Sequence, residues 1–313
     1  MEQIKKWGSK IVQIPARIMI IPLFLGASVY TFIPQILEIG SFTTAVFSNE
    51  AATTLMGLQL LCLGSRIEIR KFGQVFRYGG AILFGKILSG FVLAVVCMNL
   101  FGKDGFWGIS VLAMICAVSN TNGSMYLSFM AAKGDKLGGA ASPIITINNG
   151  PFVTLVLLGM TGLSSFDYMQ LIAALFPVVF GLVLGNISEK CKEFLAPGCS
   201  LLIPFIGFSL GAGINLKNLF FGGMSGILLG VIAVVVSVII TGLSDKYIGG
   251  NTGYGGIVAS CVGANAIAVP AFIGQMDASF APYVEAATAQ VAAAAIVSIF
   301  LVSAISSWWS HNY

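Results

Sequence analysis

The chain has 313 residues, of which 57% are hydrophobic and only 9% are charged, and its formal net charge is +4. An ordinary soluble domain carries about 25% charged residues. The composition therefore excludes a water-soluble enzyme, a nucleic-acid-binding protein and a disordered chain, and it predicts an all-α polytopic membrane protein. At about 20 residues per membrane crossing, with short connections, the length accommodates about ten transmembrane helices.

Apolar stretches recur along the chain with polar breaks between them. The predicted spans are 17–36, 49–65, 75–101, 106–132, 137–161, 167–186, 195–213, 219–244, 253–276 and 281–309. The second and seventh are short and weakly hydrophobic, so we expect them to pack against other helices rather than face lipid.

The basic residues fix the expected orientation, because cytoplasmic loops carry the excess of Lys and Arg. With the N-terminus inside, only Lys103 and Lys217 fall in outer loops, and Lys86 lies inside a span. The other basic residues lie on the inner side: Lys5, Lys6, Lys10, Arg17, Arg66, Arg70, Lys71, Arg77, Lys133, Lys136, Lys190, Lys192 and Lys246. This pattern favours ten spans with both termini in the cytoplasm.

The two halves of the chain resemble each other. Residues 64–70 match residues 211–217 at an offset of 147, and 105–109 and 253–257 open the next helix pair in each half with the same pattern. Five spans in each half would place the halves in opposite orientations, which is the inverted-repeat plan of secondary transporters. We therefore expect one five-helix repeat over 1–163 and a second over 164–313.

The fourth span of each half is predicted to be discontinuous. Its centre reads Ser119-Asn120-Thr121-Asn122-Gly123-Ser124 in the first half, and the counterpart over 263–270 contains Asn265 and ends at Pro270, which interrupts helical hydrogen bonding. Irregular backbone at this depth is tolerated where it lines a cavity. Two crossed, broken helices would then direct N–H groups at a carboxylate. The alternative is that the asparagines only join neighbouring helices.

A few other polar residues are stranded in apolar runs. They are Lys86 in the third span, Asn148 and Asn149 in the fifth, and Glu285, Thr288 and Gln290 in the tenth. An ionisable group at depth is a functional candidate by default. Lys86 has a structural alternative, pairing with Glu285 or with carbonyls, and Glu285 has an interfacial one.

The chain resembles the 2-keto-3-deoxygluconate permeases, which are bacterial inner-membrane symporters. The stretches that carry the resemblance run in order over nearly the whole length: Ile21-Pro22-Leu23-Phe24-Leu25-Gly26-Ala27, Gly40-Ser41-Phe42-Thr43, Thr121-Asn122-Gly123 with Tyr126, Gly150-Pro151, Leu202-Ile203-Pro204-Phe205, Ala286-Ala287-Thr288 and Ser307-Trp308. The resemblance implies ten helices in two inverted repeats with crossed broken helices 4 and 9. It also implies proton-coupled import of a keto-deoxy sugar acid, and Lys86 matches a lysine of that family.

The chain departs from this family at positions that bear on ion coupling. Ser119 and Asn148 stand where relatives carry carboxylates, whereas Glu285 replaces an uncharged residue. If those carboxylates carry the proton in relatives, the coupling site in this chain has moved away from Ser119 and Asn148, and Glu285 is the first candidate for its new position. The other possibility is a different coupling ion. Oxygens of Asn120, Asn149 and Glu285 would suit sodium.

The sequence thus predicts a symporter that imports a small sugar-acid anion, with 2-keto-3-deoxygluconate the first candidate, coupled to protons, by alternating access. The coupling ion, H⁺ or Na⁺, is the only cofactor expected. A sodium-coupled carrier of a different organic anion is the alternative. We expect a monomer or homodimer in the bacterial inner membrane that contacts lipid and no nucleic acid. An intramembrane enzyme is disfavoured, because the single histidine, His311, lies in the tail. The predicted substrate-binding residues are Lys86, Asn120, Thr121, Asn122, Gly123, Asn148, Asn149, Asn265, Thr288 and Gln290.

Overall fold

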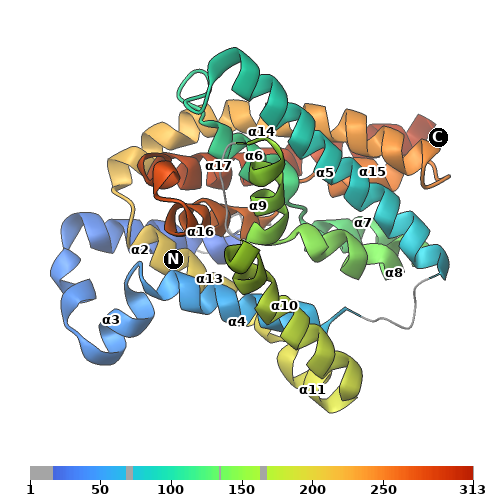
Figure 1. Cartoon of the computed structure of the whole chain (residues 1–313). Helices are drawn as coiled ribbons and strands as arrows, with labels where there is room; N and C mark the ends of the chain where they lie inside the picture. The colour runs from blue at the N-terminus through green and yellow to red at the C-terminus, as the bar shows by residue number, and fades with distance from the viewer. Residues whose placement is uncertain (1–16, 68–72, 134, 163–167, 313) are drawn as a thin grey trace, which may run out of the picture.

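A computed structural model of the chain describes residues 17–67, 73–133, 135–162 and 168–312. The regular secondary structure in these parts is helical, joined by turns and short irregular segments, with an isolated bridge between Phe106 and Ile109 (Figure 1). The elements, in order, are α2 (Arg17–Phe32), η1 (Pro34–Glu38), α3 (Ser41–Phe47), α4 (Ala51–Ser65), α5 (Gly73–Phe101), α6 (Val111–Ser119), α7 (Gly123–Lys133), α8 (Lys136–Ile145), η3 (Thr146–Asn148), α9 (Pro151–Met160), α10 (Tyr168–Ile187), α11 (Glu189–Leu195), α12 (Gly198–Leu201), α13 (Ile203–Gly211), α14 (Leu216–Tyr247), α15 (Tyr254–Ala259), η4 (Ala264–Ala268), α16 (Val269–Met276), η5 (Ala278–Tyr283) and α17 (Val284–Asn312).

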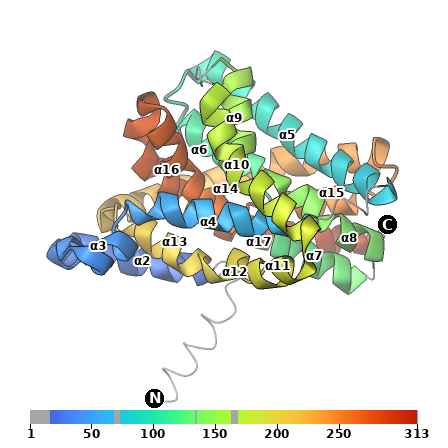
Figure 2. The same ribbon diagram turned by 60° about the horizontal axis from the view of Figure 1, so that its bottom comes forward.

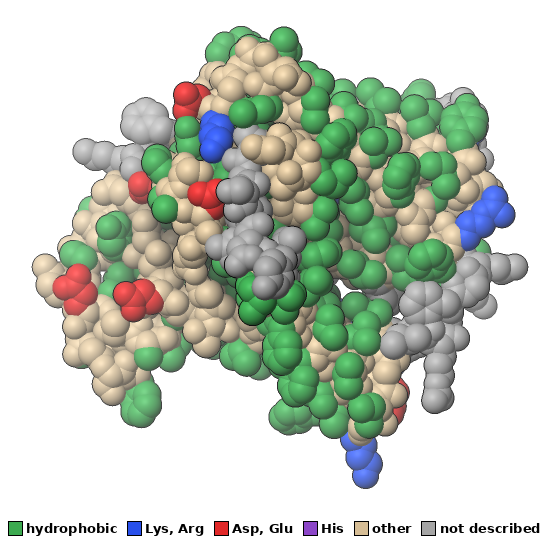
Figure 3. Space-filling model, viewed as in Figure 1, with side chains coloured by type: hydrophobic (Ala, Val, Ile, Leu, Met, Phe, Trp, Pro, Cys, Tyr) green, Lys and Arg blue, Asp and Glu red, His purple; other side chains and the backbone are tan. Residues whose placement is uncertain are grey.

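Many of these helices are apolar enough for a membrane. In the described parts of the chain, five helical stretches are long and apolar enough to cross a bilayer, and a pair bent by 59° around residues 148–151 would make a sixth. Shorter apolar helices cover Ile21–Phe32, Ala51–Ser65 and Leu175–Ile187. Apolar side chains dominate the face in Figure 3, where charged side chains are sparse. The chain is therefore a multi-pass membrane protein, as predicted, while the count of ten spans stays a prediction.

The helices pack in two groups. The long helices α5, α14 and α17 lie side by side, with α14 between the other two. In the second group α2 packs against α13, and α4 packs against α10 (Figure 2). The broken helices are packed with the first group, since α6 and α15 both contact α5, α14 or α17.

The α2–α13 pair is a backbone-to-backbone contact. A Cβ added at Gly26 would overlap the carbonyl oxygen of Phe208, and one added at Gly211 would overlap the carbonyl oxygen of Leu23. Small residues at a helix interface allow this close approach in membranes, where packing and not water exclusion drives association.

The α4–α10 pair repeats the same arrangement. A Cβ at Gly64 would overlap the carbonyl oxygen of Val178, and one at Gly181 would overlap that of Leu61. The contacting positions correspond between the two pairs. Leu23 and Gly26 of α2 match Val178 and Gly181 of α10 at an offset of 155. Leu61 and Gly64 of α4 match Phe208 and Gly211 of α13 at an offset of 147.

Two helical stretches are interrupted where the sequence predicts it. Between α6 and α7, residues 120–122 are not helical, and between α15 and η4 the interruption covers 260–263. Residues 264–268 then form the 3-10 helix η4, and α-helix resumes only at Val269, so the irregular stretch covers 260–268 and overlaps the predicted segment 263–270. Pro270 lies in the first turn of α16. A proline is tolerated there, because the N–H that it lacks has no partner within the helix.

Candidate functional site

The two interruptions meet in the interior. The backbone N–H of Asn122 donates to the carbonyl oxygen of Cys261 at 2.9 Å, which joins the first break to the second. A Cβ on Gly263 would lie 2.6 Å from the carbonyl oxygen of Thr121. Gly263 has φ −73° and ψ 145°, a conformation open to any residue, so closeness and not backbone strain accounts for a glycine at this position.

Amide side chains tie the first break to the segment between η3 and α9. Asn120 Oδ1 accepts from the N–H of Gly150 at 3.0 Å, and Asn149 Oδ1 accepts from the N–H of Thr121 at 3.2 Å. Asn148 Nδ2 donates to Thr121 Oγ1 at 2.9 Å. These groups lie in the buried interior, where a polar backbone needs partners. The asparagines therefore satisfy the irregular backbone and hold the two segments together.

Three further features belong to this network. Ser119 Oγ and Thr154 Oγ1 are 2.9 Å apart. Asn148 Oδ1 is fully buried and has no hydrogen-bond partner among the described residues. Asn122 Oδ1 accepts from the N–H of Met125 at 3.1 Å and so caps the N-terminus of α7.

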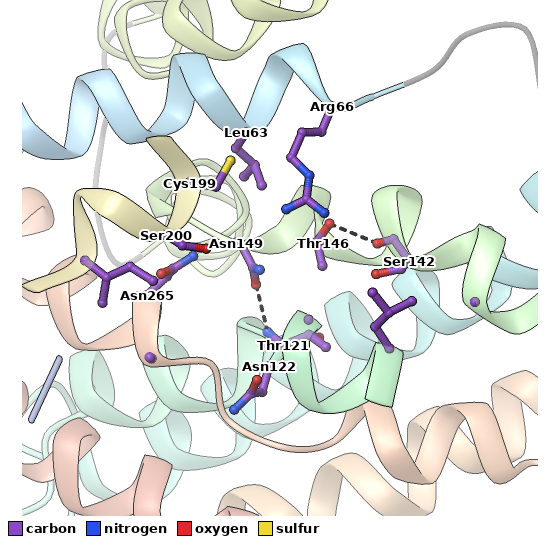
Figure 4. A pocket seen from close by; sticks show the side chains of 15 residues that line it. Leu63, Arg66, Thr121, Asn122, Ser142, Thr146, Asn149, Cys199, Ser200 and Asn265 are labelled. Carbon is purple, nitrogen blue, oxygen red and sulfur yellow. Dashed lines mark hydrogen bonds between the residues drawn. The ribbon is translucent and has the colours of Figure 1, made fainter. Parts of the chain in front are cut away.

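A cavity of about 250 Å³ opens beside the meeting point of the breaks (Figure 4). Its wall comes from the C-terminal end of α4, the first break, α7, α8, the η3–α9 segment, the α12–α13 segment and the start of η4: Leu63, Arg66, Thr121, Asn122, Gly123, Leu127, Gly139, Ser142, Thr146, Asn149, Cys199, Ser200, Ile203, Ala264 and Asn265. A second, smaller cavity of about 30 Å³ shares Leu63, Asn149, Cys199 and Asn265 with it.

The larger cavity suits an anion. Arg66 is the one charged residue among the described residues that line it, and no Asp or Glu is among them. The Arg66 side chain extends from the C-terminal end of α4 toward Thr146 (Figure 4). Gly123, the first residue of α7, is also in the wall, and the N-terminus of a helix favours negative charge.

The structure brings five of the predicted binding residues to this cavity: Thr121, Asn122, Gly123, Asn149 and Asn265. The others are not in its wall. Asn120 and Asn148 lie in the network behind it. Thr288 donates to the carbonyl oxygen of Val284 in its own helix, at 2.8 Å, and Gln290 Nε2 donates to the carbonyl oxygen of Gly108 at 2.7 Å.

The predicted ionisable residues lie elsewhere. Lys86, fully buried on α5, donates to Ser237 Oγ on α14 at 3.1 Å. Glu285 accepts from the N–H of Asn215 at 2.9 Å, so neither contact joins the two residues. The proposed sodium-ligand oxygens of Asn120, Asn149 and Glu285 each accept a backbone N–H from a different part of the chain.

Sequence reasoning missed Arg66, Ser142, Thr146 and Ser200 as cavity residues. Arg66 was assigned only to the count of inner basic residues. The signal that could have found it is the repeat itself, because the position that matches Arg66 in the second half is Gly213. A charge present in one half only, at the end of a span that lines the same cavity as the first break, marks a difference in chemistry.

A polar cavity at broken helices, enclosed in an apolar helical bundle, defines a membrane transport protein. The sodium proton antiporter MjNhaP1 from Methanocaldococcus jannaschii has a similar structure, with a TM-score of 0.52 over 93% of this chain and 90% of that one. At 16% sequence identity this likeness concerns the fold alone.

Sequence comparison identifies the family. Residues 8–313 match the family model of the 2-keto-3-deoxygluconate permeases. The chain is 41% identical over 298 residues to 2-keto-3-deoxygluconate permease 1 of Salmonella typhimurium, covering 95% of this chain and 93% of the relative. It is 34% identical over 306 residues to the permease of Xanthomonas euvesicatoria pv. vesicatoria, covering 96% of each. The chain belongs to the 2-keto-3-deoxygluconate permease family, whose members are transporters and not enzymes.

Proposed function

We propose that the chain imports 2-keto-3-deoxygluconate, or a close sugar acid, together with protons by alternating access. The cavity at the helix breaks is the observation that supports this most directly. A sugar acid presents one carboxylate and several hydroxyl groups. The wall offers one guanidinium, a helix N-terminus, and amide and hydroxyl side chains, with no carboxylate among its described residues to repel the substrate.

In this proposal Arg66 and the first turn of α7 bind the substrate carboxylate. Arg suits this role because its planar guanidinium can donate two parallel hydrogen bonds to a carboxylate. Asn122, Asn149 and Asn265 bind the hydroxyl groups, since an amide side chain both donates and accepts. Asn122 Oδ1 already accepts from Met125 and Asn149 Oδ1 from Thr121, so both residues would contribute Nδ2 to the substrate.

Alternating access rests on two inverted repeats, over 1–163 and 164–313, with the broken helices crossing between them. The matching glycine contacts of α2–α13 and α4–α10 support this arrangement, because helices at corresponding positions of the two halves exchange partners. By the positive-inside rule the Arg66 end of α4 is cytoplasmic, so the larger cavity faces the cytoplasm. Around the smaller cavity, Met56, Leu60 and Val269 would then close the outer side.

The direct test is counterflow of labelled 2-keto-3-deoxygluconate in proteoliposomes that contain the purified protein. We expect saturable exchange, accumulation driven by an inward proton gradient, and strong loss of exchange in Asn122→Ala. Asn99→Ala is the matched control, because the Asn99 amide is exposed and donates to Val95 of its own helix. Unchanged exchange in Asn122→Ala would refute the site.

The competing proposal is a sodium-coupled carrier of a different anion. One observation favours it: the Asn148 Oδ1 atom is buried and has no hydrogen-bond partner in the described chain. A neutral amide oxygen of this kind is a suitable ligand for sodium. Replacing sodium with potassium at fixed pH separates the two. Proton-driven uptake should be indifferent to the replacement, whereas a sodium carrier should stop.

A further inference from the structure

Lys86 is a buried cation without a carboxylate partner. Its side chain is fully buried on α5, and Nζ donates to Ser237 Oγ at 3.1 Å. Ser89 Oγ lies 3.5 Å from the same hydroxyl. No ion pair joins Lys86 to an acidic residue within the described chain. Burying an ammonium group with only hydroxyl contacts is costly, and such a residue inside a membrane is a functional candidate.

The titratable groups around Lys86 come from the elements packed against α5. On α14 the nearest acid along the helix is Asp245, eight residues after Ser237, and its carboxylate accepts from Asn251 and from the N–H of Gly256. The second helix break contributes the Cys261 thiol, which interacts electrostatically with Lys86. Lys86 therefore faces a thiol and hydroxyl groups.

Lys86 is connected to the site through Cys261. The carbonyl oxygen of Cys261 accepts the N–H of Asn122, and Asn122 is in the cavity wall. Cys261 thus interacts electrostatically with Lys86 and accepts a hydrogen bond at the junction of the two breaks. A change of charge on Lys86 acts on the backbone segment that forms the substrate cavity, although Lys86 itself is not in the cavity wall.

We propose that Lys86 carries the proton that is transported with the substrate, an inference that rests on the proposed function. With an anion in the cavity, the ammonium form is stabilised by the opposite charge nearby. After the anion leaves, an unpaired cation remains in the interior, and it releases its proton to the open side as the neutral amine. One anion and one proton then cross together without net charge, while Arg66 keeps its charge throughout, because a guanidinium does not deprotonate in proteins.

Three replacements of Lys86 test this role, each assayed for counterflow exchange and for accumulation driven by a proton gradient. Lys86→Gln and Lys86→Met remove the proton carrier, so we expect loss of accumulation while exchange persists and no longer depends on pH. Lys86→Arg supplies a permanent cation, so it should also lose accumulation. The control is Lys103→Gln, since Lys103 lies in an exposed outer segment and contacts Ser279 there.

The remaining outcomes overturn the inference. Accumulation that survives in Lys86→Gln or Lys86→Met would show that another group carries the proton. Accumulation restored by Lys86→Arg would assign Lys86 a fixed structural charge. Loss of exchange in every folded replacement would place Lys86 in substrate binding instead. Failure of the wild-type protein to exchange 2-keto-3-deoxygluconate would refute the proposed function, which is a separate result.

Discussion

Replacing Gly263 with alanine adds one methyl group at the closest approach of the two helix breaks. The new Cβ would lie 2.6 Å from the carbonyl oxygen of Thr121 and 3.0 Å from its carbonyl carbon, both backbone atoms that cannot rotate away. The conformation of Gly263 is one that alanine adopts freely. The perturbation is therefore purely steric.

The size of the effect follows from these distances. An ordinary contact begins at 3.4 Å, so the breaks must separate by about 0.8 Å. The same displacement lengthens the Asn122–Cys261 hydrogen bond from 2.9 Å to a distance at which it is no longer a hydrogen bond. Leaving those buried groups unpaired costs about 1–3 kcal/mol. If the two breaks do not separate, the overlap of the new methyl group with the Thr121 carbonyl costs about the same free energy through overpacking. The protein pays one of these two costs and not both.

We expect Gly263→Ala to lower the thermal stability of the purified protein in detergent and to weaken substrate binding by up to about 5- to 150-fold, the equivalent of 1–3 kcal/mol. The assays are a fluorescence-detected melting curve and the concentration dependence of counterflow. Gly223→Ala is the matched control, because nothing lies within 4 Å of a Cβ at Gly223 on α14. Wild-type melting and wild-type exchange in Gly263→Ala would refute the contact between the breaks.

Three further predictions concern the cavity and the helix contacts. Arg66→Gln should raise KM for the sugar acid about 10- to 150-fold, the value of about 1.5–3 kcal/mol for a hydrogen bond to a charged group, with partial recovery in Arg66→Lys; an unchanged KM contradicts the role of Arg66. Gly211→Ala should destabilise the protein by overlap with backbone, whereas Gly57→Ala, with open space, should stabilise it by about 0.5–1 kcal/mol in a melting assay; equal effects contradict the close contact. A maleimide that modifies Cys199 should block transport, and bound substrate should protect against this modification. The Cys199→Ala variant should resist the maleimide, and a block that persists in this variant contradicts a place for Cys199 in the substrate cavity.

Sequence reasoning located the helix breaks because their signals are local. The polar run over 119–124 predicts a break in an otherwise apolar helix, and residues 120–122 are indeed non-helical. The predicted segment 263–270 overlaps the second irregular stretch, which begins at Ser260 and ends where Pro270 occupies the first turn of α16. The non-helical residues 260–263 are held by partners distant in sequence. Ser298 Oγ, for example, accepts a hydrogen bond from the N–H of Val262 at 3.0 Å.

The membership of the cavity was less predictable for the same reason. Asn122 and Asn265 could be predicted as site residues from the breaks that contain them. Arg66 reaches the cavity because the C-terminal end of α4 forms part of its wall. Thr288 and Gln290 do not reach it, and their side chains donate to backbone carbonyls elsewhere. Such outcomes depend on how helices are rotated about their axes, which an apolar run does not encode.

Arg66 and Gly213 occupy matching positions in the two halves, and this difference in charge has a consequence for the direction of transport. If each half adopts the backbone geometry that the other half has now, a matching recess opens on the opposite membrane face, and its rim carries glycine where the present one carries a guanidinium. Substrate arriving from that face would meet fewer positive charges on entry. The apparent affinity should then depend more steeply on ionic strength when measured from the Arg66 face than from the other, so that the two faces of one carrier would be chemically distinct.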